Sequence, residues 1–409
     1  MVSDAVATPP LDGLRVLDLT TFLSGPFCTQ ILADLGADVV KVEPPDGDSS
    51  RHIPPYFVGD DSAYFMASNR SKRSVAVDMR SVDGVGLVRR LIAQADVVVE
   101  NFRPGVPGRL GLDIAALRAE HPALIWASIT GFGLTGPWAK RPAYDMIVQA
   151  LSGVMSLTGE PGRPSVRMGI PAGDTVAGLY ATVAINAALV QRGVTGQGRH
   201  IDIGMLDCQL AMLSYQSAYA LIGGAVPGPQ GARHDSIPTY RTFVARDGRQ
   251  VAVTANTDRM WQGLCRAIER EDLLDDPRFS NGRSRLANKE PLWAELEPAF
   301  DARDAQDWTV VLTENDVPNA LVKSVPEALE DARRAGRGMI VACEDGDDDS
   351  VEMVGSPIRM GAGVPVPPRF PPRLGADAED ALADWIGMDA DAVADLTERG
   401  VLLKRAVSP

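Results

Sequence analysis

The stretch GIPAGDTVAG (169–178) places one carboxylate, Asp174, directly before a run of small and apolar residues. This run predicts a helix over residues 174–192 that is apolar on nearly all sides and therefore buried. A carboxylate at a helix start can act as a nucleophile in acyl transfer, with its anion stabilised by about 0.3–1 kcal/mol through the helix dipole. It can also simply cap the helix, a common use of aspartate. The local sequence alone favours the cap.

Positively charged residues lie at the ends of predicted strands, where they could bind phosphate groups. From spacing alone, solvated loop charges are the more common outcome. The first strand–helix turn, TTFLSGP (20–26), lacks the G-x-G-x-x-G pattern that lets a backbone approach a pyrophosphate, which disfavours an ordinary nicotinamide enzyme. The positively charged residues at the predicted strand ends are Lys72, Arg73, Arg80, Arg103 and Arg109.

Strands and helices alternate through the first half of the chain. This alternation predicts an α/β fold with an open parallel sheet that binds ligands at the carboxyl ends of its strands. The predicted strands span residues 14–19, 38–43, 74–79, 96–101, 123–130 and 201–205. The predicted helices begin near Pro26 and span residues 85–95, 174–192 and 206–222.

Two stretches rich in glycine and proline predict boundaries in the second half. We expect the first part of a large domain at 1–222, a linker at 223–239, a small α/β domain at 240–330, and a linker with a C-terminal return to the large domain at 331–409. The acidic run at 344–352 predicts a solvated hairpin tip. The other predicted elements are strands at 240–245 and 250–255 and helices near 258–270, 291–316, 377–387 and 389–400.

Composition excludes several classes of protein. The 409 residues carry a net charge of −14, which argues against binding to nucleic acid. The cysteines are scattered and predict free thiols in a reducing compartment, and the histidines lack the spacing of metal ligands. We see no leader and no apolar run of the ~18 residues that a membrane span needs, so we expect a soluble cytoplasmic protein. The cysteines are Cys28, Cys208, Cys265 and Cys343, and the histidines are His52, His121, His200 and His234.

A series of motifs, in register from about residue 11 to 215, resembles class III CoA-transferases. This family includes formyl-CoA and carnitine CoA-transferases and the related 2-methylacyl-CoA racemases. The resemblance implies a large Rossmann-like domain with a parallel sheet, a smaller α/β domain and an interlocked homodimer. The motifs include LADLGADVVKVEPPDGD, NRSKRSVAVDMR, ADVVVENFRPG, SITGFGLTGP, YDMIVQALSG and TGQGRHIDIGMLD.

The resemblance also implies a mechanism and a set of site residues. Asp174 matches the family's catalytic aspartate, which forms a mixed anhydride with the acyl group and then an aspartyl-CoA thioester. The substrates would be an acyl-CoA and a small carboxylic acid, with no metal and no cofactor beyond the CoA thioester. The implied CoA contacts are Ser24, Val77, Asp78, Met79, Arg80, Asn101, Phe102, Arg103, Arg109, Tyr144 and Asp145.

Some of these positions have alternative roles. Arg80 and Arg109 suit the ADP phosphates, and Val77 and Met79 could offer apolar or backbone contact to adenine. Asn101 could equally be a turn residue at a strand end. Phe102 and Tyr144 could as readily be core aromatics.

The chain departs from formyl-CoA transferases at Leu23 and Pro44 and lacks their glycine run, so that specificity is not expected. The nearest candidate for a covering loop is 228–236, where Arg233 or His234 could bind an acceptor carboxylate.

Two other functions fit the sequence less well. Racemases carry Gly-His-Asp where this chain has Ala143-Tyr144-Asp145, and a tyrosine with a pKa near ~10 is a poor base beside a histidine near ~6.5. A non-catalytic CoA-binding protein would not need a nucleophile, so the retained Gly173-Asp174 pair disfavours it.

Overall fold

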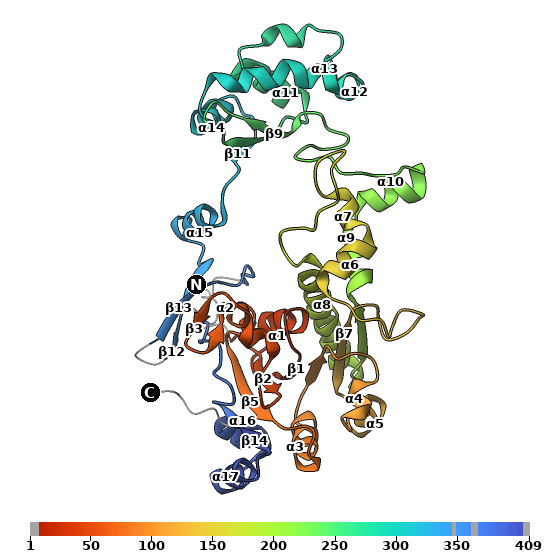
Figure 1. The fold of residues 1–409 in the computed structure, drawn as a ribbon, viewed down its shortest axis with the longest axis vertical. Helices are drawn as coiled ribbons and strands as arrows, with labels where there is room; N and C mark the ends of the chain where they lie inside the picture. Colours follow the sequence, from red (N-terminus) through yellow and green to blue (C-terminus); the bar gives the residue numbers. More distant parts are fainter. Residues whose placement is uncertain (1–7, 346–348, 361–366, 404–409) are drawn as a thin grey trace. The chain divides into compact units, whose positions relative to one another are not determined.

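The computed structural model describes residues 8–345, 349–360 and 367–403, and the chain divides into two compact units (Figure 1). The large unit comprises residues 1–154, 167–225 and 335–409. The small unit comprises residues 155–166 and 226–334. The sequence pattern does not set residues 155–166 apart, although they belong to the small unit.

Among the described residues, seven strands of the large unit form one sheet in the order β14-β5-β2-β1-β6-β7-β8. All pairs are parallel except β14, which pairs antiparallel with β5. The strand order reverses between β1 and β6, which is where doubly wound sheets open a ligand crevice. The strands are β1 (Arg15–Leu19), β2 (Asp38–Glu43), β5 (Lys72–Val77), β6 (Val97–Glu100), β7 (Ile125–Thr130), β8 (His200–Gly204) and β14 (Leu402–Leu403).

Helices cover both faces of this sheet, because its strands are apolar on both sides. Leu17 and Val40 face one hydrophobic core, whereas Val16 and Val39 face another. The predicted open α/β fold with a mainly parallel sheet is therefore confirmed. The helices of the large unit are α1 (Ser24–Asp34), α2 (Ala63–Met66), α3 (Val82–Ile92), α4 (Val106–Arg109), α5 (Ile114–Glu120), α6 (Asp145–Ser152), α8 (Ala172–Thr195), α9 (Met205–Met212), α10 (Tyr215–Gly223), α16 (Ala378–Ile386) and α17 (Ala390–Glu398), with α7 (Val154–Leu157) at the unit boundary.

Short hairpins complete the large unit. Strands β3 (Phe57–Val58) and β4 (Asp61–Ser62) form one, and β12 (Ile340–Asp345) and β13 (Asp349–Val354) form the other. The second confirms the predicted hairpin, although its tip at 346–348 lies outside the described residues.

The small unit packs helices on an antiparallel sheet ordered β11-β10-β9. Its core includes Phe243 stacked on Phe300 at 4.1 Å between ring centroids. The single helix predicted at 291–316 is wrong, because Pro298 cannot continue the backbone ladder of α13 and a short 3₁₀ helix intervenes. The elements are β9 (Tyr240–Val244), β10 (Gln250–Thr254), β11 (Asn319–Leu321), α11 (Asp258–Ala267), α12 (Gly282–Ala287), α13 (Lys289–Leu296), α14 (Ala305–Glu314) and α15 (Val325–Arg334).

Two predictions about the helices of the large unit are wrong. Residues 206–222 form two helices, α9 and α10, because Ser214 between them adopts a positive φ of 52° that breaks the helical path. Helix α8 is not buried on all sides, since Val183 is 65% exposed and Val194 is 86% exposed.

Helix α8 also bears on the expectation that no segment could span a membrane. Among the described residues it is the one helix long and apolar enough to do so by length and composition. It begins with Asp174 in its first turn, and Ala177, Ala181 and Ile185 pack in the core of the large unit. One side of the helix is therefore part of the core of the large unit.

Helices α1 and α8 approach closely at Gly178. A Cβ added there would lie 2.7 Å from the Ser24 carbonyl oxygen, which is closer than real Cβ contacts allow. Both helices begin at the same edge of the sheet, so this contact fixes the spacing between their first residues.

We therefore expect Gly178→Ala to lower the free energy of unfolding of the full chain by about 1–3 kcal/mol, because the added methyl group forces the two helices apart. Gly193→Ala in the same helix is the control: nothing lies within 4 Å of its added Cβ. It should raise stability by about 0.5–1 kcal/mol. Urea unfolding followed by circular dichroism measures both, and equal effects would contradict the close approach.

Candidate active site

A cleft of about 610 Å³ opens in the large unit at the carboxyl ends of β1, β6 and β7. Its position at the reversal of strand order follows from the topology of the sheet. Seven of the residues predicted from the sequence line this cleft, namely Ser24, Asn101, Phe102, Arg103, Tyr144, Asp145 and Asp174.

The first loop of the cleft is held in place by side chains from other elements. Asn101 accepts a hydrogen bond from the Thr21 amide at 2.9 Å and donates one to the Thr21 carbonyl at 2.8 Å. The Phe22 amide donates to Asp48 Oδ1 at 3.1 Å, and Phe22 has a positive φ of 63°. Asn101 therefore braces the first loop from the end of β6, which is a long-range contact and not the local turn role considered for it.

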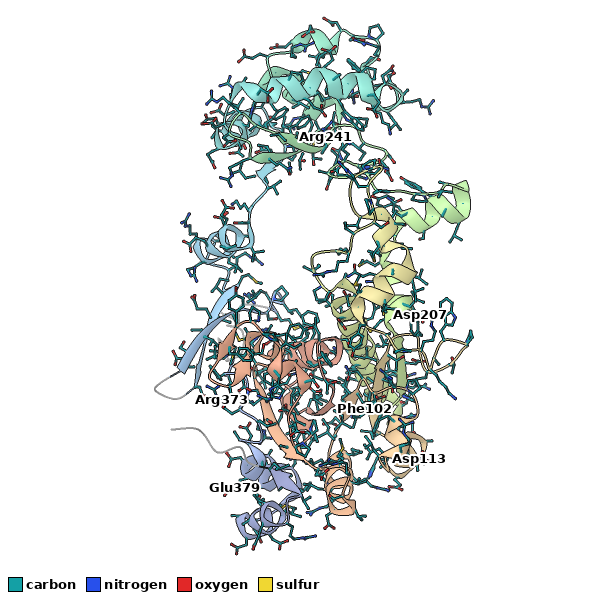
Figure 2. All side chains as sticks on the ribbon, in the orientation of Figure 1. Phe102, Asp113, Asp207, Arg241, Arg373 and Glu379 are labelled. Atoms are coloured by element: carbon teal, nitrogen blue, oxygen red, sulfur yellow. The ribbon has the colours of Figure 1, made fainter. Side chains whose placement is uncertain are left out.

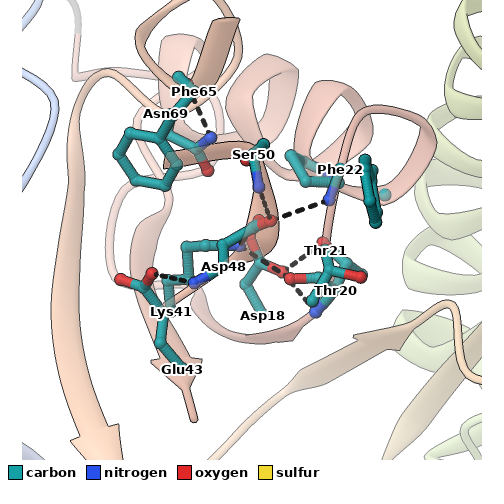
Figure 3. A network of polar contacts seen from close by, with 12 residues as sticks. Asp18, Thr20, Thr21, Phe22, Lys41, Glu43, Asp48, Ser50, Phe65 and Asn69 are labelled. Carbon is teal, nitrogen blue, oxygen red and sulfur yellow. Dashed lines mark hydrogen bonds and ion pairs between the residues drawn. The ribbon is translucent and has the colours of Figure 1, made fainter. Parts of the chain in front are cut away.

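Buried charges beneath this loop form a paired network, drawn in Figure 3. Lys41 contacts Asp48 at 3.1 Å and donates to the Thr20 carbonyl at 2.7 Å. Asp18 accepts from Lys72 at 3.0 Å. Burial disfavours the Asp18 anion, but Lys72 and Lys41 together hold its pKa below the usual range. The network fixes the loop from below.

The prediction that Lys72 and Arg73 could hold phosphate groups is wrong. Lys72 is buried and donates to Asp18, to the Pro26 carbonyl at 3.0 Å and to Asn69 at 2.8 Å, so its ammonium group has no free donor. Arg73 is paired with Asp38 and with Asp384, both on the large unit. Both cations serve the fold.

Asp174 is the third residue of α8, which begins at Ala172 after Pro171. It is therefore not the N-cap of this helix, and the capping role is wrong. Burial raises its pKa from the usual 3.8 to about 7, with a further contribution from the charge of Asp145. This rise corresponds to about 4 kcal/mol, more than the ~0.3–1 kcal/mol that the helix dipole provides. The anion is thus less stable than the sequence suggests, and a poorly solvated carboxylate is a more reactive base or nucleophile.

Asp145 holds the start of α8. Its Oδ1 accepts a hydrogen bond from the Gly173 amide at 2.7 Å, and its Oδ2 accepts one from Gln149 at 2.7 Å. A Cβ added at Gly173 would lie 2.9 Å from Asp145 Oδ1, so a larger residue would push the carboxylate away from this position. The residue predicted as a CoA contact is therefore also the residue that positions Asp174.

The two predicted aromatic residues lie differently in the cleft. Tyr144 is 64% exposed and contacts Phe22 edge to face, so the core role considered for it is wrong. Phe102, labelled in Figure 2, is partly buried and packs against the core of the large unit.

Five predicted CoA contacts lie outside the residues that line the cleft. The side chain of Val77 is buried in the core, which leaves only its backbone for a ligand, and Met79 packs partly against the same core. Asp78 and Arg80 form an exposed ion pair at 2.8 Å. Arg109 is exposed at the end of α4.

Three of the residues that the structure adds to the cleft carry ionisable side chains, and no sequence motif pointed to them: Tyr64, Arg141 and Arg167. Burial raises the pKa of Tyr64, and so do the charges of Asp174, Asp145 and Asp48. Its hydroxyl group therefore stays a hydrogen-bond donor at neutral pH.

A comparison with known protein families shows to which family the chain belongs. The model of CoA-transferase family III matches residues 11–378. The chain belongs to this family. The expected resemblance is confirmed, and the chain is a class III CoA-transferase.

Curated relatives agree over most of the chain. The succinate–glutarate CoA-transferase of Agrobacterium fabrum is 38% identical, over 92% of this chain and 96% of the relative. The acetyl-CoA:oxalate CoA-transferase of Acetobacter aceti is 39% identical, over 86% and 89%. A solved CAIB/BAIF family protein from Brucella suis is 37% identical with a TM-score of 0.84, covering 93% of this chain and all (100%) of that one.

The raised pKa of Asp174 predicts a pH-dependent stability. Because the folded pKa lies above the unfolded one, the contribution of the protonated group is present below pH 3.8 and is lost as pH rises through about 7. Asp174→Asn should therefore stabilise the chain relative to wild type by no more than about 4 kcal/mol at high pH, and progressively less toward acid.

Urea unfolding between about pH 5 and 9 measures this difference. Asp391→Asn is the matched control, because Asp391 also lies in the first turn of a helix, α17, but is exposed. A difference between Asp174→Asn and wild type that does not change with pH would contradict the raised pKa.

Proposed function

We propose that this enzyme transfers CoA from an acyl-CoA donor to a small dicarboxylic acid through covalent catalysis by Asp174. The observation that carries the proposal is a partly buried carboxylate, with its pKa raised to about 7, that lines the cleft of a family III CoA-transferase. At neutral pH about half of such a group is ionised and can attack, and burial limits the water that would hydrolyse its intermediates.

The proposed first half-reaction has two steps. A carboxylate oxygen of Asp174 attacks the thioester carbon, the carbon–sulfur bond breaks, and CoA leaves as a thiolate beside a mixed anhydride. The thiolate then attacks the aspartyl carbonyl carbon, so that the donor acid leaves as a carboxylate and Asp174 becomes an aspartyl-CoA thioester. Each step is easier than direct exchange between two acids.

The second half-reaction reverses these steps with the acceptor. The acceptor carboxylate attacks the aspartyl thioester, the thiolate leaves, and a new anhydride forms. Attack of the thiolate on the acceptor's acyl carbon gives the product thioester and frees Asp174. These reaction steps need no cofactor beyond the CoA thioester. The Tyr64 hydroxyl is suited to donate a hydrogen bond to the oxyanions that develop.

Two observations support a dicarboxylic acid as the acceptor: the positive charges of the cleft and the substrates for which the relatives are named. Three guanidinium groups line the cleft with Asp174, and one of them could hold the carboxylate that does not react: Arg103, Arg141 or Arg167. The relatives named above are named for succinate, glutarate and oxalate. Among the described residues that line the cleft none is a histidine, which speaks against a racemase.

We also propose a cytoplasmic homodimer, interlocked as the family resemblance implies. Its support is an apolar surface on the large unit. Helix α10 has no buried residue in the described structure, and Leu221 and Ile222 are 85% and 87% exposed. The exposed side of α8 is similarly apolar. Surfaces of this kind are covered in stable assemblies.

Asp174→Asn should abolish both CoA exchange and covalent labelling. Wild-type enzyme incubated with succinyl-CoA should gain the mass of CoA less one water on the peptide that contains Asp174, and the variant should gain none. Turnover should fall by at least ~10³-fold. Asp391→Asn should keep wild-type labelling and rate. Exchange at the parental rate in Asp174→Asn would exclude this residue as the nucleophile.

Asp145→Asn tests the coupling of the two carboxylates. It keeps an oxygen that can accept from the Gly173 amide but removes the charge that raises the pKa of Asp174. The lower midpoint of the pH profile of kcat/KM should fall by on the order of one pH unit. Asp391→Asn should leave the midpoint unchanged, and an unchanged midpoint in Asp145→Asn would contradict the coupling.

A further inference from the structure

Two arginines stand directly opposite each other in the small unit. Residues 232–234 pair antiparallel with β9, so that Arg233 is the bridge partner of Arg241. The pairing is held by hydrogen bonds from the Thr242 amide to the Ala232 carbonyl at 3.1 Å and from the His234 amide to the Tyr240 carbonyl at 3.0 Å. The side chains of two directly paired residues project from the same face of a sheet, and two like charges in such a pair repel each other. The arrangement therefore needs a compensating group.

Both guanidinium groups contact the ring of Trp293. Arg233 lies 4.9 Å and Arg241 5.1 Å from the ring centroid of Trp293. Trp293 is itself fixed, because its indole N–H donates to the Pro238 carbonyl at 2.8 Å. Lys289 adds a third cation at 5.7 Å from the same ring. The two guanidinium planes are thus held in place rather than free in solvent.

Each of these arginines keeps a buried donor that is not used. Arg241 is 7% exposed, pairs with Glu297 at 2.6 Å and donates from Nε to the Thr242 carbonyl, but its Nη1 has no hydrogen-bond partner in the described structure. The Nε of Arg233 is buried and likewise without a partner among the described residues. Burial, with the charge of Arg233, lowers the pKa of Arg241. Unpaired donors on buried cations are costly, so both call for an acceptor.

The acceptor has room in a cavity of about 510 Å³ lined by both arginines (Figure 2 labels Arg241). Three carboxylates also line it, Glu160, Glu297 and Asp301. Glu297 already offsets one of the two guanidinium charges, and the exposed Glu160 and Asp301 repel a highly charged ligand. One further negative charge completes the site, whereas a phosphate or other polyanion does not suit it.

We propose that Arg233 and Arg241 form a binding site for a small monoanionic carboxylate in this cavity. All residues of the site belong to the small unit. The proposal goes beyond CoA transfer and does not depend on Asp174. Of the two residues considered from the sequence, Arg233 lines the cavity and His234 does not.

Trp293 provides a local readout in the full chain. The chain is labelled with 5-fluorotryptophan, and the ¹⁹F signal of Trp293 is assigned with Trp293→Phe. We expect sodium acetate to shift this signal saturably, while sodium chloride at equal ionic strength does not and sodium phosphate binds more weakly than acetate. Asp174→Asn should leave the shift intact, which separates this result from any failure of the proposed CoA transfer.

Variants then test the two arginines. Arg233→Gln and Arg241→Gln should each weaken acetate binding at least tenfold. Arg246→Gln is the control, because Arg246 is exposed on the same unit and paired with Asp304 at 2.9 Å. If Arg241→Gln does not fold, Arg241→Lys and Arg233→Gln carry the test. An equal shift with chloride, no saturable shift, or full binding in both glutamine variants would overturn the proposal, and tighter binding of phosphate would overturn the monoanion assignment.

Discussion

The hydrogen bond from the Gly173 amide to Asp145 Oδ1, at 2.7 Å, fixes the start of α8. It also brings a second carboxylate beside Asp174, in a place where burial already disfavours negative charge. The same contact thus positions Asp174, the proposed nucleophile, and makes its anion less stable, and a Cβ at position 173 would push the Asp145 carboxylate away. The close contact at Gly178 then sets how far α8 stands from α1, whose first residue, Ser24, lines the same cleft.

The proposed reactivity of Asp174 requires rigid surroundings, because a mobile site would admit water and lose the effect of burial. The network of Asp18, Lys41, Asp48 and Lys72 supplies this rigidity under the first loop. Each buried charge in it has an opposite partner and further hydrogen bonds, so the desolvation of the ions is offset. Lys72, which the sequence offered as a phosphate ligand, is therefore part of the support of the cleft.

The sequence predicted the sheet and the nucleophile for different reasons. Strand β6 carries apolar residues on both faces, with Val97 and Val99 in one core and Val98 in the other, and this pattern predicts a buried parallel strand. Asp174 was found through its motif. Side-chain pairing over long separations was not predictable: Lys72 meets Asp18 across 54 positions in the chain. Neither was the break at Ser214, where one residue with a positive φ ends a helix whose composition would continue it. Only the folded chain shows that Tyr64 lines the cleft.

The ionisation of Asp174 is the central claim, and infrared difference spectroscopy measures it directly. Spectra of wild-type enzyme titrated across neutral pH, minus those of Asp174→Asn, should contain the carbonyl band of a protonated carboxyl group that disappears with a midpoint near pH 7. A band that is already lost by about pH 5, near the ordinary value of an aspartate, would contradict the account.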